Sequence, residues 1–259
     1  MSEGTDNALL ERFEQEVWSK VPHLEEGSET KVVNATPLVD MTADFKECAK
    51  TVFKLDLDNA DLKVFGKMDC TLLTGSIKVR PAANIIHDAI VSGKIKSGQT
   101  VIEATSGNFG IALGLLSKLG LTVIALVSRK LQEGVFEELR NGNIRTMDLD
   151  MDICPAPGME GKQNLMVAKA TAANVRSQLS NLGFDTEIFD KEISEIESLL
   201  AKQDIINLAK FLAKIYGFFC PSQYDNQLNI EAHRTITAAE IDQQLHENGD
   251  SLENFNIFC

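Results

Sequence analysis

The feature that most constrains this fold is an alternation of apolar strands and helices in the middle of the chain. At its centre Leu121–Val127 is a continuous apolar run, typical of a strand covered on both faces in a parallel sheet. Strand patterns lie on either side, at Thr100–Ala104 and Ile144–Leu149, and helical patterns connect them at Asn108–Leu119 and Leu131–Asn141. Such strand–helix–strand units predict a doubly wound α/β sheet.

Patterns outside this alternation predict further elements. Pro81 suits the first turn of a helix that Gly93 would end. We also expect helices at Ala8–Ser19, Lys162–Leu182, Ile193–Ile215 and Ala232–Leu245, and a helix or loop at Ala43–Thr51. The remaining strands are expected at Asp61–Met68, Thr186–Phe189, Phe218–Cys220 and Phe255–Cys259.

Composition excludes several classes of function. The net charge of −13 without a lysine or arginine run argues against a nucleic-acid surface, and no apolar run approaches a membrane span. The five cysteines are scattered without a CxxC pair, so we expect free thiols and no metal site. The first residues, Met1–Asn7, are polar and acidic and do not resemble a signal peptide, which leads us to expect a cytoplasmic protein.

Two polar loops at the ends of apolar segments are the candidate functional sites. Thr74–Pro81 places Lys78 between apolar Ile77 and Val79, directly before a helix. A lysine is usually a solvated surface charge, but partial burial can lower its pKa and make the amine a nucleophile. Spacing alone leaves both readings of Lys78 open.

The second loop, Thr105-Ser106-Gly107-Asn108, lies between the predicted strand Thr100–Ala104 and the helix that follows it. Free N–H groups at a helix start can bind an anion, and a carboxylate suits this short turn better than a pyrophosphate. Ordinary capping by Ser106 or Asn108 is the alternative. Neither a dinucleotide nor a P-loop motif is present.

Both loops resemble the motifs of one enzyme family. Thr74-Gly75-Ser76-Ile77-Lys78-Val79-Arg80-Pro81 and Thr100–Asn108 are similar to segments of the cysteine synthase (O-acetylserine sulfhydrylase) family of fold-type-II pyridoxal-phosphate enzymes. The resemblance runs from about Thr36 to Cys259, in the family's order. Shorter matches are Thr36-Pro37-Leu38, Gln223-Tyr224-Asp225-Asn226, Glu231-Ala232-His233 and Thr237–Ile241.

The resemblance implies an α/β, tryptophan synthase β-like fold with two doubly wound sheets and an incomplete C-terminal part. We expect residues 1–35 to form an N-terminal helical extension. Residues 36–81 and 151–259 would form a larger cofactor domain, and residues 82–150 a smaller mobile subdomain.

The resemblance also implies roles for individual residues. Lys78 would form the Schiff base with pyridoxal 5′-phosphate and accept the α-proton of the substrate, and Asn108 would bind the ring hydroxyl. The substrate carboxylate would be held by Thr105, Ser106, Gly107 and Gln223. The implied reaction is β-elimination or β-replacement on a β-substituted L-alanine such as O-acetyl- or O-phosphoserine, in amino-acid biosynthesis. An amine nucleophile, as in a diaminopropionate-type synthase, is a variant, and a homodimer is expected.

The sequence departs from the family pattern at Leu73, Val79 and Phe109, where proline, aspartate and threonine are usual. Phe109 removes a hydroxyl and adds bulk, so we expect an altered substrate preference. No segment matches the family's glycine- and threonine-rich phosphate loop or the later residue that faces the pyridine nitrogen. The alternative is therefore a truncated, non-catalytic relative that acts as a regulatory or interaction module.

Overall fold

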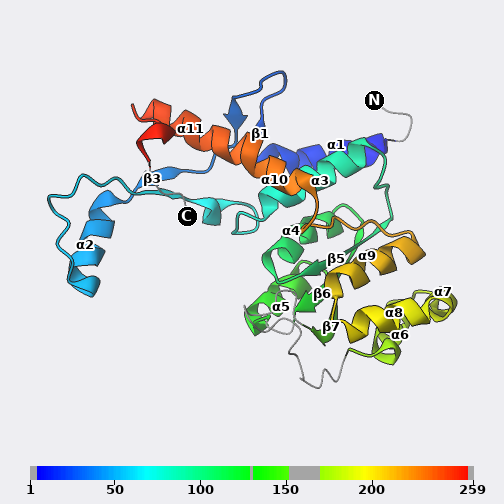
Figure 1. Cartoon of the computed structure of the whole chain (residues 1–259). Coiled ribbons are helices and arrows are strands. Elements are labelled where there is room, and N and C mark those ends of the chain that lie inside the picture. The colour runs from blue at the N-terminus through cyan, green and yellow to red at the C-terminus, as the bar shows by residue number, and fades with distance from the viewer. Residues whose placement is uncertain (1–4, 129–130, 152–169, 256–259) are drawn as a thin grey trace.

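A computed structural model describes residues 5–128, 131–151 and 170–255, which are built around a parallel sheet (Figure 1). This three-stranded sheet has the order β5-β6-β7, and its strands are Thr100–Thr105, Thr122–Ser128 and Arg145–Met151. All three predicted strands of the alternation are confirmed. The strand expected at Phe218–Cys220 is reduced to a single parallel bridge between Phe219 and Val101 at the free edge of β5.

One face of the sheet is covered by α4 and α5, with α3 packed on α4 and α1 packed on α3. Alternate strand residues such as Val101 and Val123 point into this core. Helix α4 is buried on most sides because it lies between the sheet and α3, as its apolar sequence predicts. The bounds of these helices are Asn7–Glu16, Val79–Val91, Asn108–Ser117 and Glu133–Asn141.

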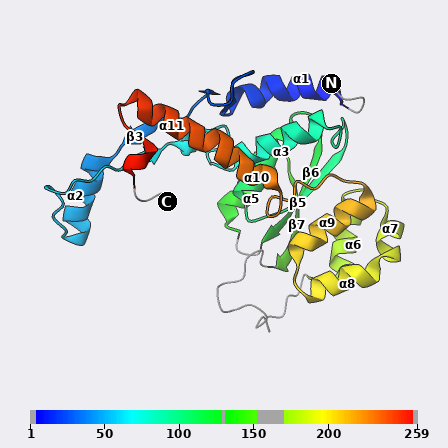
Figure 2. The ribbon, with the colours of Figure 1, turned by 45° about the horizontal axis from the view of Figure 1, so that its top comes forward.

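The opposite face is covered by α6 (Ala172–Asn181), α7 (Thr186–Lys191), α8 (Ile193–Ala201) and α9 (Ile205–Tyr216). Figure 2 shows these helices on the other side of the strands from α3. The helix expected at Lys162–Leu182 is confirmed from Ala172 onward, and its earlier residues lie largely outside the described ranges.

Two predictions on this face are wrong. Thr186–Phe189 is helical rather than extended, because the Asp185 side chain caps α7 by accepting from the Glu187 amide at 2.9 Å. The single helix expected at Ile193–Ile215 is two helices. The chain turns between them at Gln203, with φ of 56°, and Asp204 caps α9 by accepting from the Asn207 amide at 3.0 Å.

The segment before α3 projects from the compact part as an arm, which we define as residues 38–67 (Figures 1 and 2). Strand β3 (Leu38–Asp40) pairs antiparallel with β4 (Phe65–Lys67), and α2 (Thr42–Phe53) lies between them in sequence. The helical alternative for Ala43–Thr51 is therefore correct, and the strand expected at Asp61–Met68 is shorter than predicted. A second antiparallel pair joins β1 (His23–Leu24) to β2 (Val32–Val33).

The C-terminal helices form a continuous rod beside α3 (Figure 1). It consists of α10 (Gln227–Glu231), the π-helical segment Ala232–Thr237 and α11 (Ala238–Glu247), which confirms the helix expected at Ala232–Leu245. The short 3₁₀ turns of the chain lie at Trp18–Lys20, Asp69–Thr71 and Leu252–Asn254. The strand expected at Phe255–Cys259 lies outside the described residues except for Phe255. The ring of Phe255 contacts that of Phe65 edge-on, with the two ring centroids 5.5 Å apart.

The α/β class is confirmed, with helices on both faces of the parallel sheet. Among residues 5–128, 131–151 and 170–255 this is the one parallel sheet, so these residues do not contain the second doubly wound sheet that the resemblance implied. The proposed division at residue 150 stays a prediction. It would separate β7 from α6–α9, although these share one hydrophobic core.

Candidate active site

Lys78 stands at the start of α3, at the end of a tight turn. Gly75 adopts φ of 67° and donates its amide to Leu72 O at 2.8 Å, and the Ser76 hydroxyl accepts from the Lys78 amide at 3.3 Å. Lys78 is half-buried, whereas Val79 immediately after it is fully buried. The turn thus places the lysine where a buried helix meets the surface.

Two polar groups of this loop have no partner in the part of the chain that the structure describes. The Lys78 amine makes no hydrogen bond or ion pair with a described residue, and the Thr74 hydroxyl is buried without a hydrogen bond. A buried, unsatisfied hydroxyl costs about 1–3 kcal/mol, so such a group commonly marks the place of a missing ligand or water. The loop therefore offers a free amine and a free hydroxyl four residues apart.

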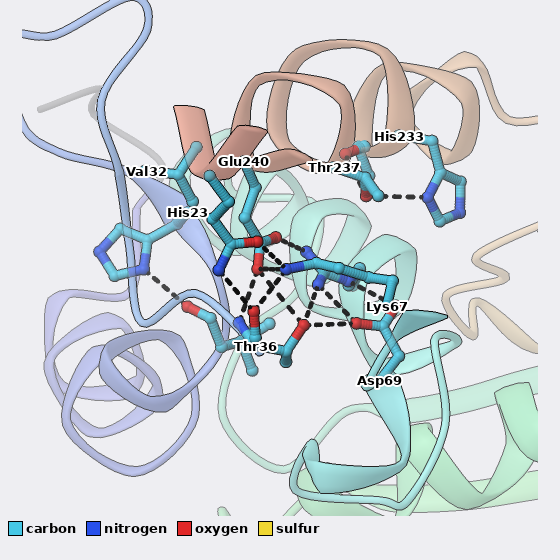
Figure 3. A network of polar contacts seen from close by, with 12 residues as sticks. His23, Val32, Thr36, Lys67, Asp69, His233, Thr237 and Glu240 are labelled. Atoms are coloured by element: carbon cyan, nitrogen blue, oxygen red, sulfur yellow. Dashed lines mark hydrogen bonds and ion pairs between the residues drawn. The ribbon is translucent and has the colours of Figure 1, made fainter. Parts of the chain in front are cut away.

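A buried ionic network anchors the helix directly behind Lys78 (Figure 3). The Arg80 guanidinium donates to Asp69 Oδ1 at 2.6 Å, to Glu240 Oε2 at 2.5 Å and to Thr36 Oγ1 at 3.1 Å. Lys67 Nζ donates to Glu240 Oε1 at 2.6 Å. The network thus ties residue 36, the end of β4, the first turn of α3 and α11 to one another.

The electrostatics of this network depend on its burial. The Arg80 and Glu240 side chains are fully buried, and each is matched by an opposite charge. Burial disfavours the charge on Arg80, but the hydrogen bonds to Asp69 and Glu240 outweigh it and raise the pKa of Arg80. Burial lowers the pKa of Lys67 despite its contact with Glu240. Removing one partner of such a pair leaves an uncompensated charge, which costs about 3–5 kcal/mol.

The turn Thr105–Asn108 lies at the carboxyl end of β5. The Thr105 hydroxyl is buried and accepts from the amides of Gly107 and Gly110, each at 3.1 Å. Gly107 adopts φ of 136°, and a Cβ added there would lie 3.0 Å from Val135 Cγ1, so glycine suits this position best. Ser106 and Asn108 are exposed. Thr105 therefore organises the turn from inside, while Ser106 and Asn108 face outward.

Phe109 does not add bulk on the outer side of this turn. Its side chain is 2% exposed and belongs to the core between α3, α4 and the sheet. The bulk expected from Phe109 therefore lies in the interior. At the turn itself, the difference from the family pattern is the missing threonine hydroxyl.

Gln223 is held against the same end of β5. It is 6% exposed, and its Nε2 donates to Ala104 O at 3.0 Å. Its backbone amide donates to Glu103 Oε2 at 3.2 Å. The structure thus brings Gln223 together with the strand that leads into Thr105–Asn108. No hydrogen bond or ion pair joins Lys78 to that turn among the described residues.

Sequence reasoning assigned no role to Glu103 or Glu240. Glu103 could have been noticed because it is the one acidic residue of the apolar strand Thr100–Thr105. Glu240 had no such signal, because its partner Arg80 is 160 residues away in the sequence.

His233 lies in the π-helical segment, and its Nδ1 is 3.1 Å from Thr237 Oγ1. Burial and the positive charges of Lys78 and Arg80 lower the pKa of His233, so its ring lies within electrostatic reach of the Lys78 loop. A cavity of about 290 Å³ lies away from this loop, between α3 and the segment that includes Phe219 and Leu228.

Two other kinds of feature are absent from the described part of the chain. Residues 5–128, 131–151 and 170–255 contain no cluster of three His, Cys, Asp or Glu side chains able to hold a metal ion. Within the same residues, no helix has both the length and the apolar character needed to cross a membrane.

Most of this chain is similar to known proteins. A family model described as "Pyridoxal-phosphate dependent enzyme" matches residues 36–253. A cysteine synthase of Staphylococcus aureus is 27% identical over 227 residues, which cover 87% of this chain and 54% of the relative. A cysteine synthase of Aquifex aeolicus is 39% identical over 94 residues, which cover 36% of this chain and 26% of the relative.

Two further similarities come from other enzymes. An N-(2-amino-2-carboxyethyl)-L-glutamate synthase of Cupriavidus metallidurans is 29% identical over 195 residues, covering 74% of this chain and 45% of the relative. The crystal structure of O-ureido-L-serine synthase is similar in fold, with a TM-score of 0.50 and 23% identity over 84% of this chain and 49% of that one. The chain thus spans about half the length of the curated relatives that it matches over most of its residues.

Proposed function

Because the chain belongs to the family of pyridoxal-phosphate dependent enzymes, we propose that it binds pyridoxal phosphate through Lys78. The proposed reaction is β-elimination or β-replacement on a β-substituted L-alanine, with O-acetyl- or O-phosphoserine as the substrate. The similarity to cysteine synthases and to an N-(2-amino-2-carboxyethyl)-L-glutamate synthase supports this reaction class.

The observation that carries the proposal concerns two groups of one loop: among the described residues, the half-buried amine of Lys78 has no polar partner and the buried hydroxyl of Thr74 has no hydrogen bond. A lysine that only served solubility would extend into solvent, and a structural lysine would pair with an acid, as Lys67 does with Glu240. Lys78 does neither among the described residues. A free lysine amine in this loop fits the part of a pyridoxal-phosphate site that binds the aldehyde of the cofactor.

In the proposed reaction Lys78 has two tasks. When bound, pyridoxal phosphate supplies an electron sink for the charge that develops at the substrate α-carbon. Lys78 Nζ holds the cofactor in the resting state, and its freed amine accepts the α-proton of the substrate. The Arg80 network keeps the first turn of α3 in place, which limits how far Lys78 can move from the α-carbon.

The other loop orients the substrate. The exposed Ser106 hydroxyl and the backbone N–H groups at the start of α4 would hold the substrate carboxylate, as an anion is favoured at a helix N-terminus. Gln223 lies at the same end of β5 and would complete this clamp. Asn108 would donate to the ring hydroxyl of the cofactor. Thr105 shapes the turn through its two amide contacts.

Visible absorbance spectroscopy tests this function. The purified chain with added pyridoxal phosphate should develop visible absorbance that changes when O-acetyl-L-serine or O-phospho-L-serine is added. Lys78→Ala should abolish both signals, and Lys94→Ala, an exposed lysine after the same helix, should keep them. Equal signals from wild type and Lys78→Ala would contradict the proposal.

An interaction module is the second candidate function, and the arm favours it. Helix α2 has a single buried residue, Ala49, while Phe45, Val52 and Phe53 on it are 47%, 63% and 68% exposed. An apolar helix face without cover commonly marks a contact with another polypeptide. A chain that stays colourless with pyridoxal phosphate but associates through this helix would favour the second function.

A further inference from the structure

A segment after α9 is attached lengthwise to the free edge of β5, and we call it the strap, residues Phe219–Asn229. At its start the Phe219 amide donates to Thr100 O at 2.9 Å, and Phe219 O accepts from the Ile102 amide at 2.9 Å. At its end the Asn229 side chain donates to Gln223 O at 2.8 Å, a contact within the strap itself. Between these contacts the strap meets the end of β5 chiefly through Gln223.

The carboxyl group of Glu103 makes this middle attachment. Its Oε1 accepts from the Ala104 amide at 3.0 Å, and its Oε2 accepts from the Gln223 amide at 3.2 Å. The Ser222 amide also favours the ionised form of Glu103 and so acts to lower its pKa. Glu103 is 1% exposed, and a buried acid is costly unless its oxygens are used in this way. Its two oxygens thus connect β5 with the strap.

We infer that Glu103 is a positioning residue: by holding the backbone of Ser222 and Gln223, it places Gln223 beside the turn Thr105–Asn108. The inference deepens the proposed function and rests on it for the identity of the ligand, an amino-acid carboxylate. Packing alone would not require an acid here, because the neighbouring strand positions are filled by Ile102 and Ala104.

The attachment is sensitive to pH. Burial raises the pKa of Glu103 to about 7, although the amides of Gln223, Ser222 and Ala104 and the charge of Lys210 act in the opposite direction. Two ionisable groups of the strap lie near this point. Cys220 lies beside Glu103. Asp225 is paired with Lys210 of α9. Asp88 and Lys94 of the α3 region face the strap across the cavity.

The two protonation states of Glu103 hold the strap differently. An ionised carboxylate accepts with both oxygens, whereas protonation turns one oxygen into a donor that faces backbone N–H groups. While Glu103 stays buried in the folded chain, its contacts with the strap amides should therefore strengthen as the pH rises through about 7. Carboxylate binding by Gln223 and its neighbours should strengthen in the same pH range.

The first test needs neither cofactor nor substrate. In the ¹⁵N-labelled full chain, the amide signals of Ser222 and Gln223 should shift with pH with a midpoint of about 7. In Glu103→Gln, which keeps the shape but cannot ionise, the shifts should disappear. In Glu133→Gln, which changes an exposed acid on α5, they should persist. A flat wild-type profile, or an unchanged profile in Glu103→Gln, would overturn the inference.

The second test concerns the ligand, with O-acetyl-L-serine as the probe and the pyridoxal-phosphate-loaded chain. Binding should be several-fold tighter at pH 8 than at pH 6 in the wild type. In Glu103→Gln it should be about tenfold weaker than wild type at pH 8, and nearly independent of pH. A Glu103→Gln profile that retains the wild-type pH dependence would contradict the inference.

The two tests separate this inference from the proposed function. If no substrate binds but the amide signals titrate as stated, the proposed function fails and the attachment of the strap by Glu103 stands. If substrate binds but the amide signals do not titrate, the positioning role of Glu103 fails alone. Glu103→Asp, which keeps the charge on a shorter side chain, should restore a titrating signal if Glu103→Gln folds poorly.

Discussion

At the residue scale, the site depends on charged side chains placed where water is scarce. Arg80 and Glu240 neutralise each other behind Lys78, whereas Glu103 has only backbone N–H groups and the more distant Lys210 to offset its charge. The ionised form of Glu103 is therefore expensive in the folded chain. Lys78 is different again, since among the described residues its amine is left free to react.

The raised pKa of Glu103 predicts how stability changes with pH. Because the folded chain holds the proton up to about pH 7 and the unfolded chain releases it near the ordinary value of 4.5, this group's contribution to stability is lost as the pH rises through about 7. Urea unfolding should show a loss of about 1 kcal/mol between pH 6 and pH 8 from this group. Glu103→Gln should remove that loss, and Glu133→Gln should keep it.

The predicted change of stability with pH has the opposite sign to the predicted change of ligand binding with pH. Relative to the unfolded chain, raising the pH lowers stability, because the Glu103 charge is costly in the core. Within the folded chain, where Glu103 stays buried, the same charge strengthens its contacts with the amides of Ser222 and Gln223. Stability and binding that moved in the same direction with pH would contradict this assignment of Glu103.

At the element scale, the first turn of α3 is the point where distant segments meet. Thr36, Asp69 and Glu240 come from different parts of the chain and are joined through Arg80. Sequence patterns could identify α3 and the lysine before it, since helix periodicity and turn residues are local signals. The pairing of Arg80 with Glu240 could not be predicted, because residues 160 positions apart leave no local pattern.

Breaking this junction should destabilise the whole chain. Arg80→Met leaves the partly buried Asp69 without its paired cation and the buried Glu240 with Lys67 alone, so the free energy of unfolding should fall by about 3–5 kcal/mol. Arg234→Met, which removes an exposed ion pair with Glu231, should have little effect. Urea unfolding of both variants at pH 7 measures the difference, and equal stabilities would refute the role of the network.

The errors of sequence reasoning at this scale also have physical causes. Thr186–Phe189 is too short for its periodicity to distinguish a strand from a helix, and the cap at Asp185 decides in favour of the helix. The helical apolar pattern continues on both sides of Gln203, so the sequence does not show that the helix ends there. The left-handed backbone conformation of Gln203 shows it. The continuous apolar run Leu121–Val127 was predicted correctly because its strand is covered on both faces.

At the scale of the whole molecule, a compact α/β unit carries a projecting arm (Figures 1 and 2). The sequence could indicate the α/β unit through its strand–helix alternation, but it could not indicate which apolar residues remain uncovered. Six large apolar side chains of the arm are exposed: Val39, Met41, Phe45, Val52, Phe53 and Leu55. An isolated helix as short as α2 is marginal in water, so contact with another polypeptide would stabilise it.

We propose that this exposed face contributes to a homodimer. The double variant Val52→Ser with Phe53→Ser should keep the circular dichroism of the wild type, because both side chains are largely solvated. In sedimentation experiments the wild type should be dimeric and the variant should shift toward the monomer. A dimer that is unaffected by the double substitution would exclude this face as the interface.

The most direct measurement for the whole account is the chemical location of the cofactor. The chain is incubated with pyridoxal phosphate, reduced with borohydride, digested and analysed by peptide mass spectrometry. We predict that the added mass of the cofactor lies on Lys78, that Lys78→Ala loses it, and that Lys94→Ala retains it. Labelling spread over several exposed lysines, or unchanged in Lys78→Ala, would contradict the central claim.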